Sequence, residues 1–496
     1  MAGLAICLTA LRLLAARWIH LTEDEAYYRL WAQHLQFGYY DHPPMIAWWI
    51  RLGVTLIGDN PLGVRLASIL STGLATCFVA ALASTLGARP ATAFRSALWY
   101  NATTTIGLGG ILATPDSPAT LFWVVTIWCL AKVWSGGSQG WWPAAGLAAG
   151  LAVLSKYSAL FLAPGVLLWL ALLPEGRRML RSPWPWSAAL AAVAIFSANV
   201  VWNADHQWIT FAKQFGRAAP SGFSPAHLAD LLISQVFLLN PMIAIYANRG
   251  ARTGWAERSD PSAVHLLLPI ATSAPFVAYL LLHSLHDRVQ GHWPVPVFAS
   301  LVICAAVAAD RGSQVLAARV WRGVAIAVGF SLSALALIYM AAPQSRAFGT
   351  FDPILPLRGW REFSIAVDRR RVEVDAAWVG TVSYGALAQL SAERLIDAPI
   401  IQITERARYD GAPDVRPDLS QPGLIVDLAR RLEPRDLLRC FARVTPAGDI
   451  DRGARGAGPA ARYRAYLVSA PRVNVLRDGC PDDPADRKKR GRHLFS

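Results

Sequence analysis

Long apolar runs separated by short polar segments make up the first 341 residues of this chain. A helix that crosses a membrane needs about 20 mostly apolar residues, and about eleven runs approach that length. They are residues 2–20, 62–87, 93–113, 117–134, 141–155, 158–174, 184–203, 227–247, 263–282, 293–309 and 320–341. The pattern predicts a polytopic α-helical membrane protein, in which the short runs at 141–174 could form one unit kinked around Ser155-Lys156-Tyr157.

The first run is interrupted by Arg12 and Arg17. It has neither the charged start of a secretory signal peptide nor an A-x-A site followed by soluble sequence. We therefore interpret it as a short first membrane helix that can lack residues at its start.

After about residue 342 the apolar runs become too short to cross a membrane. Four runs rich in β-branched residues alternate with helical stretches such as residues 359–370, which favours a small α/β domain. The four runs are residues 376–383, 399–404, 423–428 and 464–470. We expect a membrane domain at 1–341, with residues 21–60 as its first external loop, and an α/β domain at 342–496.

Composition agrees with the membrane class. Only 16% of the 496 residues are charged and 54% are hydrophobic, whereas a soluble domain has about 25% charged residues. The formal net charge of +14 fits basic cytoplasmic loops better than nucleic-acid binding, because no basic-aromatic patch is present. The six cysteines form no CxxC motif. A bridge between Cys440 and Cys480 would need an oxidising compartment, and the sequence does not show whether the two are close.

The basic residues between the runs predict the orientation. They fall at 89–95, 177–181, 249–258 and 311–322, which lie on one side of the membrane under this count. Basic loops stay cytoplasmic. The N-terminus is then inside, and the 22–44 stretch, Asp116, the loops 204–226 and 283–292 and the C-terminal region are outside.

The stretch after the first run carries the first candidate chemistry. Thr22 followed by Glu25 is a capping-box pattern and predicts a helix start. The Trp and Tyr content of this helix suits the plane of a membrane interface. Asp24 lies in its first turn, where the helix dipole favours a charged carboxylate. Glu25 is explained by capping, whereas Asp24 is a candidate for chemistry as well as for capping.

A second helix is expected to begin at Pro44 and end near Gly53, because proline is tolerated in the first turn of a helix. Pro43 keeps His42 out of the helical conformation. Asp41 and His42 then lie at a helix N-terminus, a suitable place for an anion such as phosphate. The alternative is a helix cap beside a surface histidine.

Further polar residues are predicted at the same face. Lys156 interrupts an apolar run, and ionisable groups at such depth are functional candidates. The others are Asp116 between two spans, Gln214 and Arg217 in one loop and His292 in another. Carboxylates and cations at one membrane face suit transfer from a phosphorylated, membrane-held donor. For the loop residues, ordinary solvent exposure is the alternative.

Four motifs carry a resemblance to a known family. DEAYYRLWAQHLQFGYYDHPP, TPDSPATLFW, LAVLSKYSAL and HWPVP occur in this order. They resemble bacterial members of glycosyltransferase family 39, the group of aminoarabinose transferases and protein O-mannosyltransferases with the GT-C fold. The resemblance covers residues 1–340 well and the C-terminal region more weakly. It implies a polyprenyl-phosphate sugar donor, a periplasmic active site and inverting transfer.

The resemblance also assigns roles to residues. It implies catalysis by Asp24 and Asp116, phosphate binding by Lys156, and a place for Asp41 before the two prolines. Where arabinosyl transferases have lysine, this chain has His42, which puts their substrate in doubt.

Glu25, Gln214, Arg217 and His292 complete the expected substrate-binding set. The metal-binding histidine of the family has no clear match, since Lys213 or Gln214 stands near that place. No metal and no cofactor are therefore expected, although the sequence leaves a divalent ion open.

The resulting hypothesis is an inverting hexosyl or pentosyl transferase of the bacterial inner membrane. It would move a sugar from polyprenyl phosphate to lipid A, another glycoconjugate or a protein, with its active site and C-terminal domain on the periplasmic side. Two alternatives are a transporter or flippase of lipid-linked sugars and a non-catalytic scaffold. Transporters are expected to carry charges in mid-span and broken helices in paired halves, and a sugar-release assay would separate all three.

Overall fold

The computed structural model describes residues 2–216, 222–260, 263–311, 316–342, 348, 352–409, 415–453 and 460–480. The chain divides into two compact units. The helical unit comprises Met1–Arg17 and Gln36–Ile338, and the mixed unit comprises Trp18–Leu35 and Tyr339–Ser496. Residues 18–35 therefore group with the C-terminal region by their contacts, while the predicted boundary at residue 341 stays a prediction.

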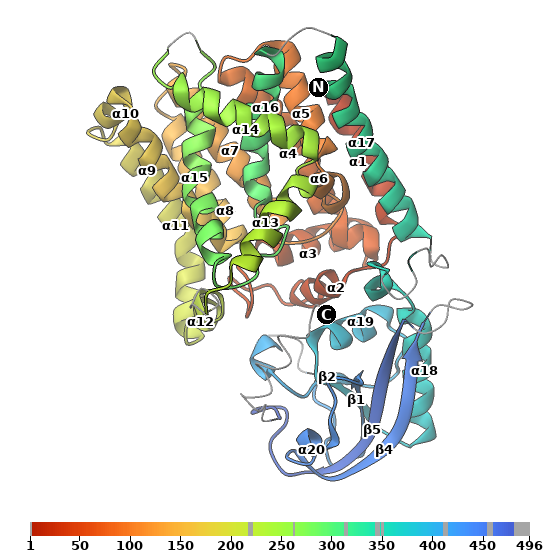
Figure 1. Cartoon of the computed structure of the whole chain (residues 1–496). Coiled ribbons are helices and arrows are strands. Elements are labelled where there is room, and N and C mark those ends of the chain that lie inside the picture. Colours follow the sequence, from red (N-terminus) through yellow and green to blue (C-terminus); the bar gives the residue numbers. More distant parts are fainter. Residues whose placement is uncertain are drawn as a thin grey trace. The chain divides into compact units, whose positions relative to one another are not determined.

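The helical unit is built from apolar helices and two short 3-10 turns (Figure 1). They are α1 (Ala2–Ala16), α3 (Met45–Ile57), α4 (Pro61–Thr85), α5 (Pro90–Ala102), α6 (Thr104–Gly109), α7 (Asp116–Trp134), α8 (Trp141–Ser155), η1 (Tyr157–Phe161), α9 (Leu162–Leu172), α10 (Pro174–Met179), α11 (Trp184–Asp205), α12 (Ile209–Gly216), α13 (Pro225–Leu238), α14 (Pro241–Ala256), α15 (Leu267–His283), η2 (Val295–Val297), α16 (Phe298–Arg311) and α17 (Leu316–Ala341).

Within the described residues, four helices are long and apolar enough to cross a membrane, and a bent pair could supply a fifth. The four are Pro61–Thr85, Asp116–Trp134, Trp184–Asp205 and Ala318–Ala341. Five shorter apolar helices accompany them, including α1 and α15. The predicted total of about eleven spans stays a prediction.

Two predicted spans are broken. The run at 93–113 divides into α5 and α6 at Thr103, and the run at 227–247 divides into α13 and α14, which meet at 104°. The second break lies at Asn240, which precedes Pro241, and proline disfavours the helical conformation in the residue before it. Asn240 has a positive φ of 78°, it caps α14 through the amide of Met242, and its own amide donates to the carbonyl of Ala325 at 2.8 Å. Hydropathy averages over such a residue and does not register the break.

The charges inside the first helix have partners. Arg12 is buried and donates to the Asn101 side chain at 2.8 Å, and Arg65 on α4 donates to the carbonyl of Ala16 at 3.1 Å. These bonds give each guanidinium group an acceptor, which lowers the cost of burying its charge. They hold α1 against α4 and α5.

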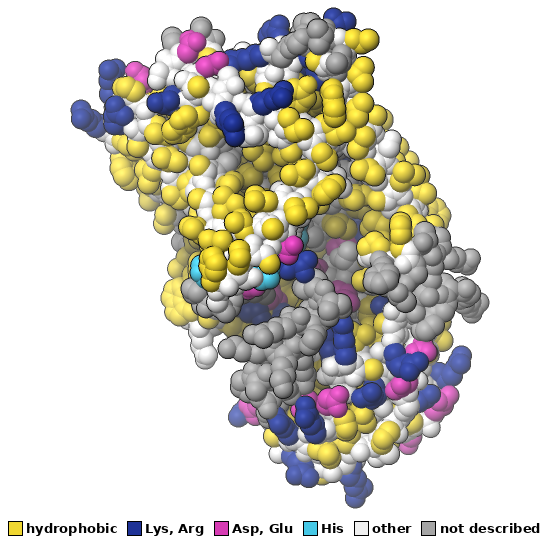
Figure 2. Space-filling view, viewed as in Figure 1, with side chains coloured by type: hydrophobic (Ala, Val, Ile, Leu, Met, Phe, Trp, Pro, Cys, Tyr) yellow, Lys and Arg dark blue, Asp and Glu magenta, His cyan; other side chains and the backbone are white. Residues whose placement is uncertain are grey.

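The surface of the helical unit is apolar along its flank and basic at one end. Figure 2 shows hydrophobic side chains covering the helices and Lys and Arg side chains gathered over α10 and neighbouring helix ends. Arg177 and Arg178 on α10 are exposed there. The clustering of basic residues at one end, expected from the loops, is thus present in the structure. Which side of a membrane this end faces stays a prediction.

The mixed unit contains a five-stranded sheet with the order β2-β1-β3-β5-β4. The strands β1 (Trp378–Thr381), β2 (Ile400–Gln402) and β3 (Gly423–Leu428) are parallel, and β5 (Ala461–Pro471) runs antiparallel to β3 and to β4 (Phe441–Arg452). The helices α18 (Trp360–Glu373) and α19 (Tyr384–Glu393) share a core with the sheet, and α20 is Pro434–Leu437. Strands are present at all four predicted runs.

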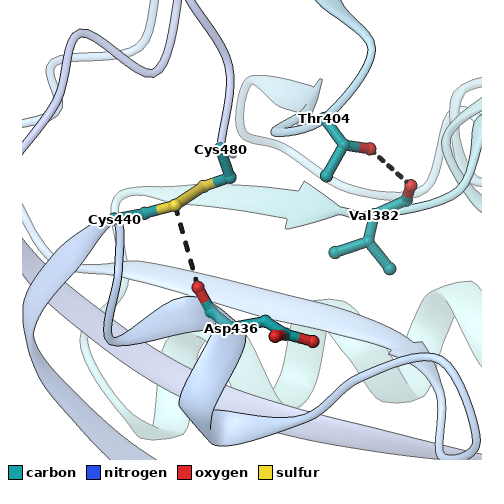
Figure 3. Close-up of a disulfide and its surroundings, with 5 residues drawn as sticks. All are labelled: Val382, Thr404, Asp436, Cys440 and Cys480. Carbon is teal, nitrogen blue, oxygen red and sulfur yellow. Dashed lines mark hydrogen bonds between the residues drawn. A yellow bond between two sulfur atoms is a disulfide. The ribbon is translucent and has the colours of Figure 1, made fainter. Parts of the chain in front are cut away.

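The long strand β4 is the element that the sequence pattern missed. It pairs with β5 as the hairpin visible in Figure 1, but its register shifts between Pro446 and Gly448. Proline and glycine are typical of turns, so they hide a bulged edge strand. Cys440 and Cys480 form a disulfide with Cα atoms 5.6 Å apart, within the usual range. Figure 3 shows this bridge, and Thr404 donating to the carbonyl of Val382 at 2.7 Å nearby.

Candidate functional site

An antiparallel helical hairpin brings Asp116 and Lys156 together. Asp116 is the first residue of α7, and Lys156 follows the last residue of α8. A short connection at 135–140 makes the two helices neighbours, so the start of α7 lies beside the end of α8. Lys156 has extended backbone angles, as the kink expected at this position requires. Its Nζ lies 2.7 Å from Asp116 Oδ1.

Two histidines from other segments approach the same carboxylate. His292 Nε2 lies 3.9 Å from Asp116 Oδ2, and His42 interacts with Asp116 electrostatically. The side chains of Asp116 and Lys156 are 13% and 14% exposed, whereas that of His292 is 52% exposed. The structure therefore brings four of the predicted site residues together in a half-open polar cluster inside the helical unit. We call Asp116, Lys156, His292 and His42 the Asp116 cluster.

The loop that carries Asp41 and His42 is held by α11 and α12. Asn199 donates to the carbonyl of Phe37 at 2.6 Å and Thr210 to that of Tyr39 at 2.7 Å. Gln214 donates to the carbonyl of Asp41. The predicted site residues Gln214 and Asp41 therefore meet through the main chain, and the carboxylate of Asp41 is buried. Gln214 acts on the shape of this loop.

The helix after this loop is longer than expected. It begins at Met45, with Pro44 as its N-cap instead of its first helical residue, and it ends at Ile57 instead of near Gly53. Gly53 lies inside the helix, and a Cβ atom there would come within 2.1 Å of the carbonyl oxygen of Gly63, so this glycine allows close packing against α4 instead of ending the helix. The predicted site residue Arg217 lies outside the described residues.

The first acidic stretch forms α2 (Glu23–Trp31) in the mixed unit. The predicted capping box is present: Glu25 N donates to Thr22 Oγ1 at 3.2 Å, and Thr22 N donates to Glu25 Oε2 at 2.9 Å. Glu25 is fully buried, so capping accounts for its side chain and its substrate-binding role stays a prediction. The helix ends at Trp31. The rings of Tyr27 and Trp31 on this helix are buried, and their centres lie 4.8 Å apart.

Asp24 is exposed and has a partner that no sequence signal indicated. The hydroxyl of Tyr384, the first residue of α19, donates to Asp24 Oδ1 at 2.9 Å. The guanidinium of Arg408 lies 4.8 Å from the centre of the Tyr384 ring. Tyr384 and Arg408 are separated from Asp24 by more than 350 positions, and neither belongs to a local motif.

Glu23 precedes Asp24 and lies in a different electrostatic setting. Burial raises the pKa of the Glu23 carboxyl. Arg431 and Arg452 oppose this shift, and Asp24 and Asp427 add to it. Glu23 therefore holds its proton to a higher pH than an ordinary glutamate does.

Among the described residues, no group of three or more His, Cys, Asp or Glu side chains is arranged to hold a metal ion. The Asp116 cluster has suitable ligand types, but Lys156 occupies one oxygen of its carboxylate. The expectation of no metal and no cofactor stays a prediction.

Comparison with known proteins supports the resemblance carried by the motifs. Residues 41–202 match the family model described as dolichyl-phosphate-mannose-protein mannosyltransferase. This segment contains Asp41, His42, Asp116 and Lys156. The resemblance to glycosyltransferase family 39 is confirmed. Among the GT39-like relatives, the lipid A galacturonosyltransferase RgtD of Rhizobium johnstonii is 26% identical over 285 residues, which are 57% of this chain and 59% of the relative.

A second relative is an undecaprenyl phosphate-α-4-amino-4-deoxy-L-arabinose arabinosyl transferase of Pseudomonas fluorescens. It is 33% identical over 161 residues, which are 31% of this chain and 28% of the relative. The matches thus span less than two thirds of either relative.

Solved structures show the fold. ArnT from Cupriavidus metallidurans, bound to undecaprenyl phosphate, is similar with a TM-score of 0.61 and 14% identity, over 93% of this chain and 97% of that one. The oligosaccharyltransferase of Archaeoglobus fulgidus is similar with a TM-score of 0.51 and 10% identity, over 86% and 69%. The chain therefore has the GT-C fold expected of the GT39-like family.

Proposed function

We propose that this protein is an integral-membrane glycosyltransferase that takes a sugar from a polyprenyl-phosphate donor. The observation that carries the proposal is the Asp116 cluster, in which Lys156 lies 2.7 Å from Asp116 with two histidines close by. A phosphate monoester leaving group gains negative charge as the glycosidic bond breaks. Cations fixed beside it stabilise that charge in the transition state.

Lys156 is the proposed phosphate ligand. An ammonium group has three donors, so its bond to Asp116 leaves capacity for phosphate oxygens. The carboxylate of Asp116 fixes the direction of the lysine side chain. His42 and His292 would add positive charge beside the phosphate when they are protonated. Asp24 is the proposed base that accepts the proton of the acceptor hydroxyl, because it is an exposed carboxylate in the first turn of α2.

The acceptor and sugar are proposed from the relatives. RgtD is named for galacturonate transfer to lipid A, and the Pseudomonas relative for arabinosyl transfer. We therefore propose lipid A as the acceptor and an inverting transfer of a pentose or a hexuronic acid. Both relatives are named as transferases, so they do not favour the alternative of a transporter or flippase. The proposed location is the bacterial inner membrane with the Asp116 cluster open to the periplasm.

Substitution of Lys156 tests the phosphate site. Lys156→Ala is expected to weaken binding of undecaprenyl phosphate at least tenfold and to lower sugar transfer by a factor of about 100 or more, on the scale of losing a charge-assisted contact in the transition state. Lys156→Arg keeps the charge but changes its shape, and it should recover part of the binding. Binding is measured by competition in detergent, and transfer by mass spectrometry of lipid A.

Lys132→Ala is the matched control. Lys132 lies in the last turn of α7, about 24 Å along the helix from Asp116, with its ammonium over the Trp128 ring. It should keep wild-type binding and transfer. Undiminished donor binding by Lys156→Ala would contradict the assignment.

A further inference from the structure

We propose that Tyr384 of α19 is a positioning residue for the carboxylate of Asp24. The C-terminal part of the chain would thereby supply a component of the catalytic apparatus. This inference rests on the proposed role of Asp24 as the base. It adds a residue 360 positions away in the sequence.

The contact between the two residues is direct. The hydroxyl of Tyr384 donates to Asp24 Oδ1 at 2.9 Å. Asp24 is exposed and Tyr384 is half-buried. A base that must accept a proton from an acceptor needs one oxygen aimed at that acceptor. A hydrogen bond to one oxygen restricts rotation of the carboxylate and stabilises its charged form.

The backbone on the N-terminal side of Tyr384 is fixed by a buried carboxylate. Asp427 accepts hydrogen bonds from the amides of Val382 and Ser383 at 2.9 and 2.7 Å. The hydroxyl of Ser383 adds a third bond at 2.8 Å. Asp427 is fully buried on β3. The sheet therefore determines where α19 begins, and Tyr384 is the first residue of that helix.

The ring of Tyr384 is held as well. The guanidinium of Arg408 lies 4.8 Å from its centre, and the ring of Tyr27 lies 4.9 Å from it. Arg408 is buried and is itself fixed by Glu405 at 2.7 Å. A cation over an aromatic ring is attracted to the electron-rich face of that ring. These contacts limit the positions available to the Tyr384 hydroxyl.

The attachment of α2 to α19 does not depend on the Tyr384 hydroxyl. Gln389 donates to the carbonyl of Leu21 at 2.8 Å, and His20 lies 2.6 Å from Glu393. A purely structural role for the hydroxyl is therefore weakly supported, because other bonds join the same two segments. Removal of this single oxygen should leave the packing of α2 in place.

Tyr384→Phe tests the inference in the full-length protein. The variant is expected to lower kcat about tenfold with an unchanged KM for the donor, because the hydrogen bond orients a carboxylate that acts in the transition state. The acidic limb of the kcat/KM profile should move to higher pH, because the charged carboxylate loses a donor. Other charged groups near this contact are Glu23 and Glu25 on α2 and Arg408 beside the Tyr384 ring. The Tyr384→Phe substitution leaves all three residues unchanged.

Tyr466→Phe is the matched control. Tyr466 belongs to the core on the sheet face away from the core that contains α19, so kcat and the pH profile should stay at wild type. Asp24→Asn is measured alongside and should abolish transfer while leaving undecaprenyl phosphate binding intact.

The outcomes separate the two proposals. If Asp24→Asn transfers sugar at the wild-type rate, the role of Asp24 and with it the inference are overturned. If Asp24→Asn is inactive but Tyr384→Phe keeps both the wild-type kcat and the wild-type pH profile, the inference alone is overturned. A loss of kcat in Tyr384→Phe without a shift of the acidic limb, accompanied by a lowered Tm, also overturns it. A tenfold loss with the shift and an unchanged Tm supports it.

Discussion

At the scale of single residues, the described contacts separate groups that look alike in the sequence. Glu23, Asp24 and Glu25 are three consecutive acidic residues with different surroundings. Glu25 completes a capping box, and Asp24 is exposed and accepts a hydrogen bond from Tyr384. Burial raises the pKa of Glu23, and Arg431 and Arg452 oppose that shift. Helical geometry explains the division, because consecutive residues point about 100° apart around the axis. Three neighbours with the same chemistry therefore meet three different surroundings.

Glu23 gives a prediction about stability and pH. Its pKa in the folded protein is raised, so the folded state holds a proton that the unfolded state releases above about pH 4.3. Stability therefore falls as pH rises from the unfolded pKa through the folded pKa. Glu23→Gln removes this titration and should raise Tm by a few degrees near pH 7, at about 2–4 °C per kcal/mol. The gain should disappear near pH 4.

Thermal unfolding of the detergent-solubilised chain across this pH range measures the effect. Glu373→Gln is the control, since Glu373 on α18 is exposed and its pair with Arg370 is a surface ion pair worth little. A Tm of Glu23→Gln that stays at or below wild type at pH 7 would argue against the burial of a costly charge.

The sequence predicted the local part of the candidate site and missed the distant part. The capping box and the break at Lys156 depend on residues within a few positions, so their signals are complete in the sequence. The meeting of Asp116 with Lys156 follows from a hairpin that hydropathy can indicate. The bond between Asp24 and Tyr384 depends on how α19 starts on the sheet, and no local pattern encodes that placement.

At the scale of elements, close helix approach in the helical unit depends on particular glycines. Gly250 of α14 lies so near α16 that a Cβ atom would come within 2.0 Å of the carbonyl oxygen of Cys304. Small residues at helix interfaces allow such contacts in membrane proteins. The neighbouring backbone would have to move to accept a methyl group.

Gly250→Ala is therefore expected to destabilise the protein by about 1–3 kcal/mol, the usual cost of overpacking. Gly323→Ala on α17 is the matched change, because a Cβ there would meet nothing within 4 Å. That variant should be stabilised by up to about 1 kcal/mol through helix propensity. Melting temperatures in detergent compare the two, and equal values would show that the α14–α16 approach does not depend on the missing Cβ.

Elements also show where a hydrophobic pattern loses information. Runs at 93–113 and 227–247 are continuous in hydropathy, but Thr103 and Asn240 break them. A single polar residue hardly changes a window average. The buried hydrogen bonds that stabilise the break, such as that from Asn240 to Ala325, exist only after the helices pack. The bulge in β4 is also hidden in the sequence, because its Pro446 and Gly448 are residue types typical of turns.

At the scale of the whole molecule, the chain is divided differently from its sequence order. Residues 18–35 belong by their contacts to the unit that contains residues 339–496. The hydrogen bonds from Gln389 to Leu21 and from Tyr384 to Asp24 join these two segments. A boundary drawn from composition alone could not include a segment that precedes most of the helical unit, because composition carries no information about distant contacts.

The disulfide and the basic loops make one joint prediction about orientation. Cys440 and Cys480 are bridged across 40 positions, and such bridges persist in oxidising compartments. Basic loops stay cytoplasmic. If both rules hold, the C-terminal region lies in the periplasm and the end of the helical unit near α10 lies in the cytoplasm. In a variant that keeps only these two cysteines, a maleimide added to denatured whole-cell extract should label neither of them until a reductant is supplied.

The disulfide also gives an expectation about stability. Closing a loop of this length is worth about 4 kcal/mol by the loop-entropy estimate, so Cys440→Ser with Cys480→Ser should lower the unfolding midpoint of the mixed unit while the helical unit keeps its own. A membrane-impermeant maleimide applied to reduced spheroplasts should reach the half-buried Cys480, but should not reach a cysteine placed at Arg178 on α10. Labelling at Arg178→Cys together with protection of Cys480 would reverse the orientation. The Asp116 cluster would then face the cytoplasm, where a periplasmic acceptor could not reach it.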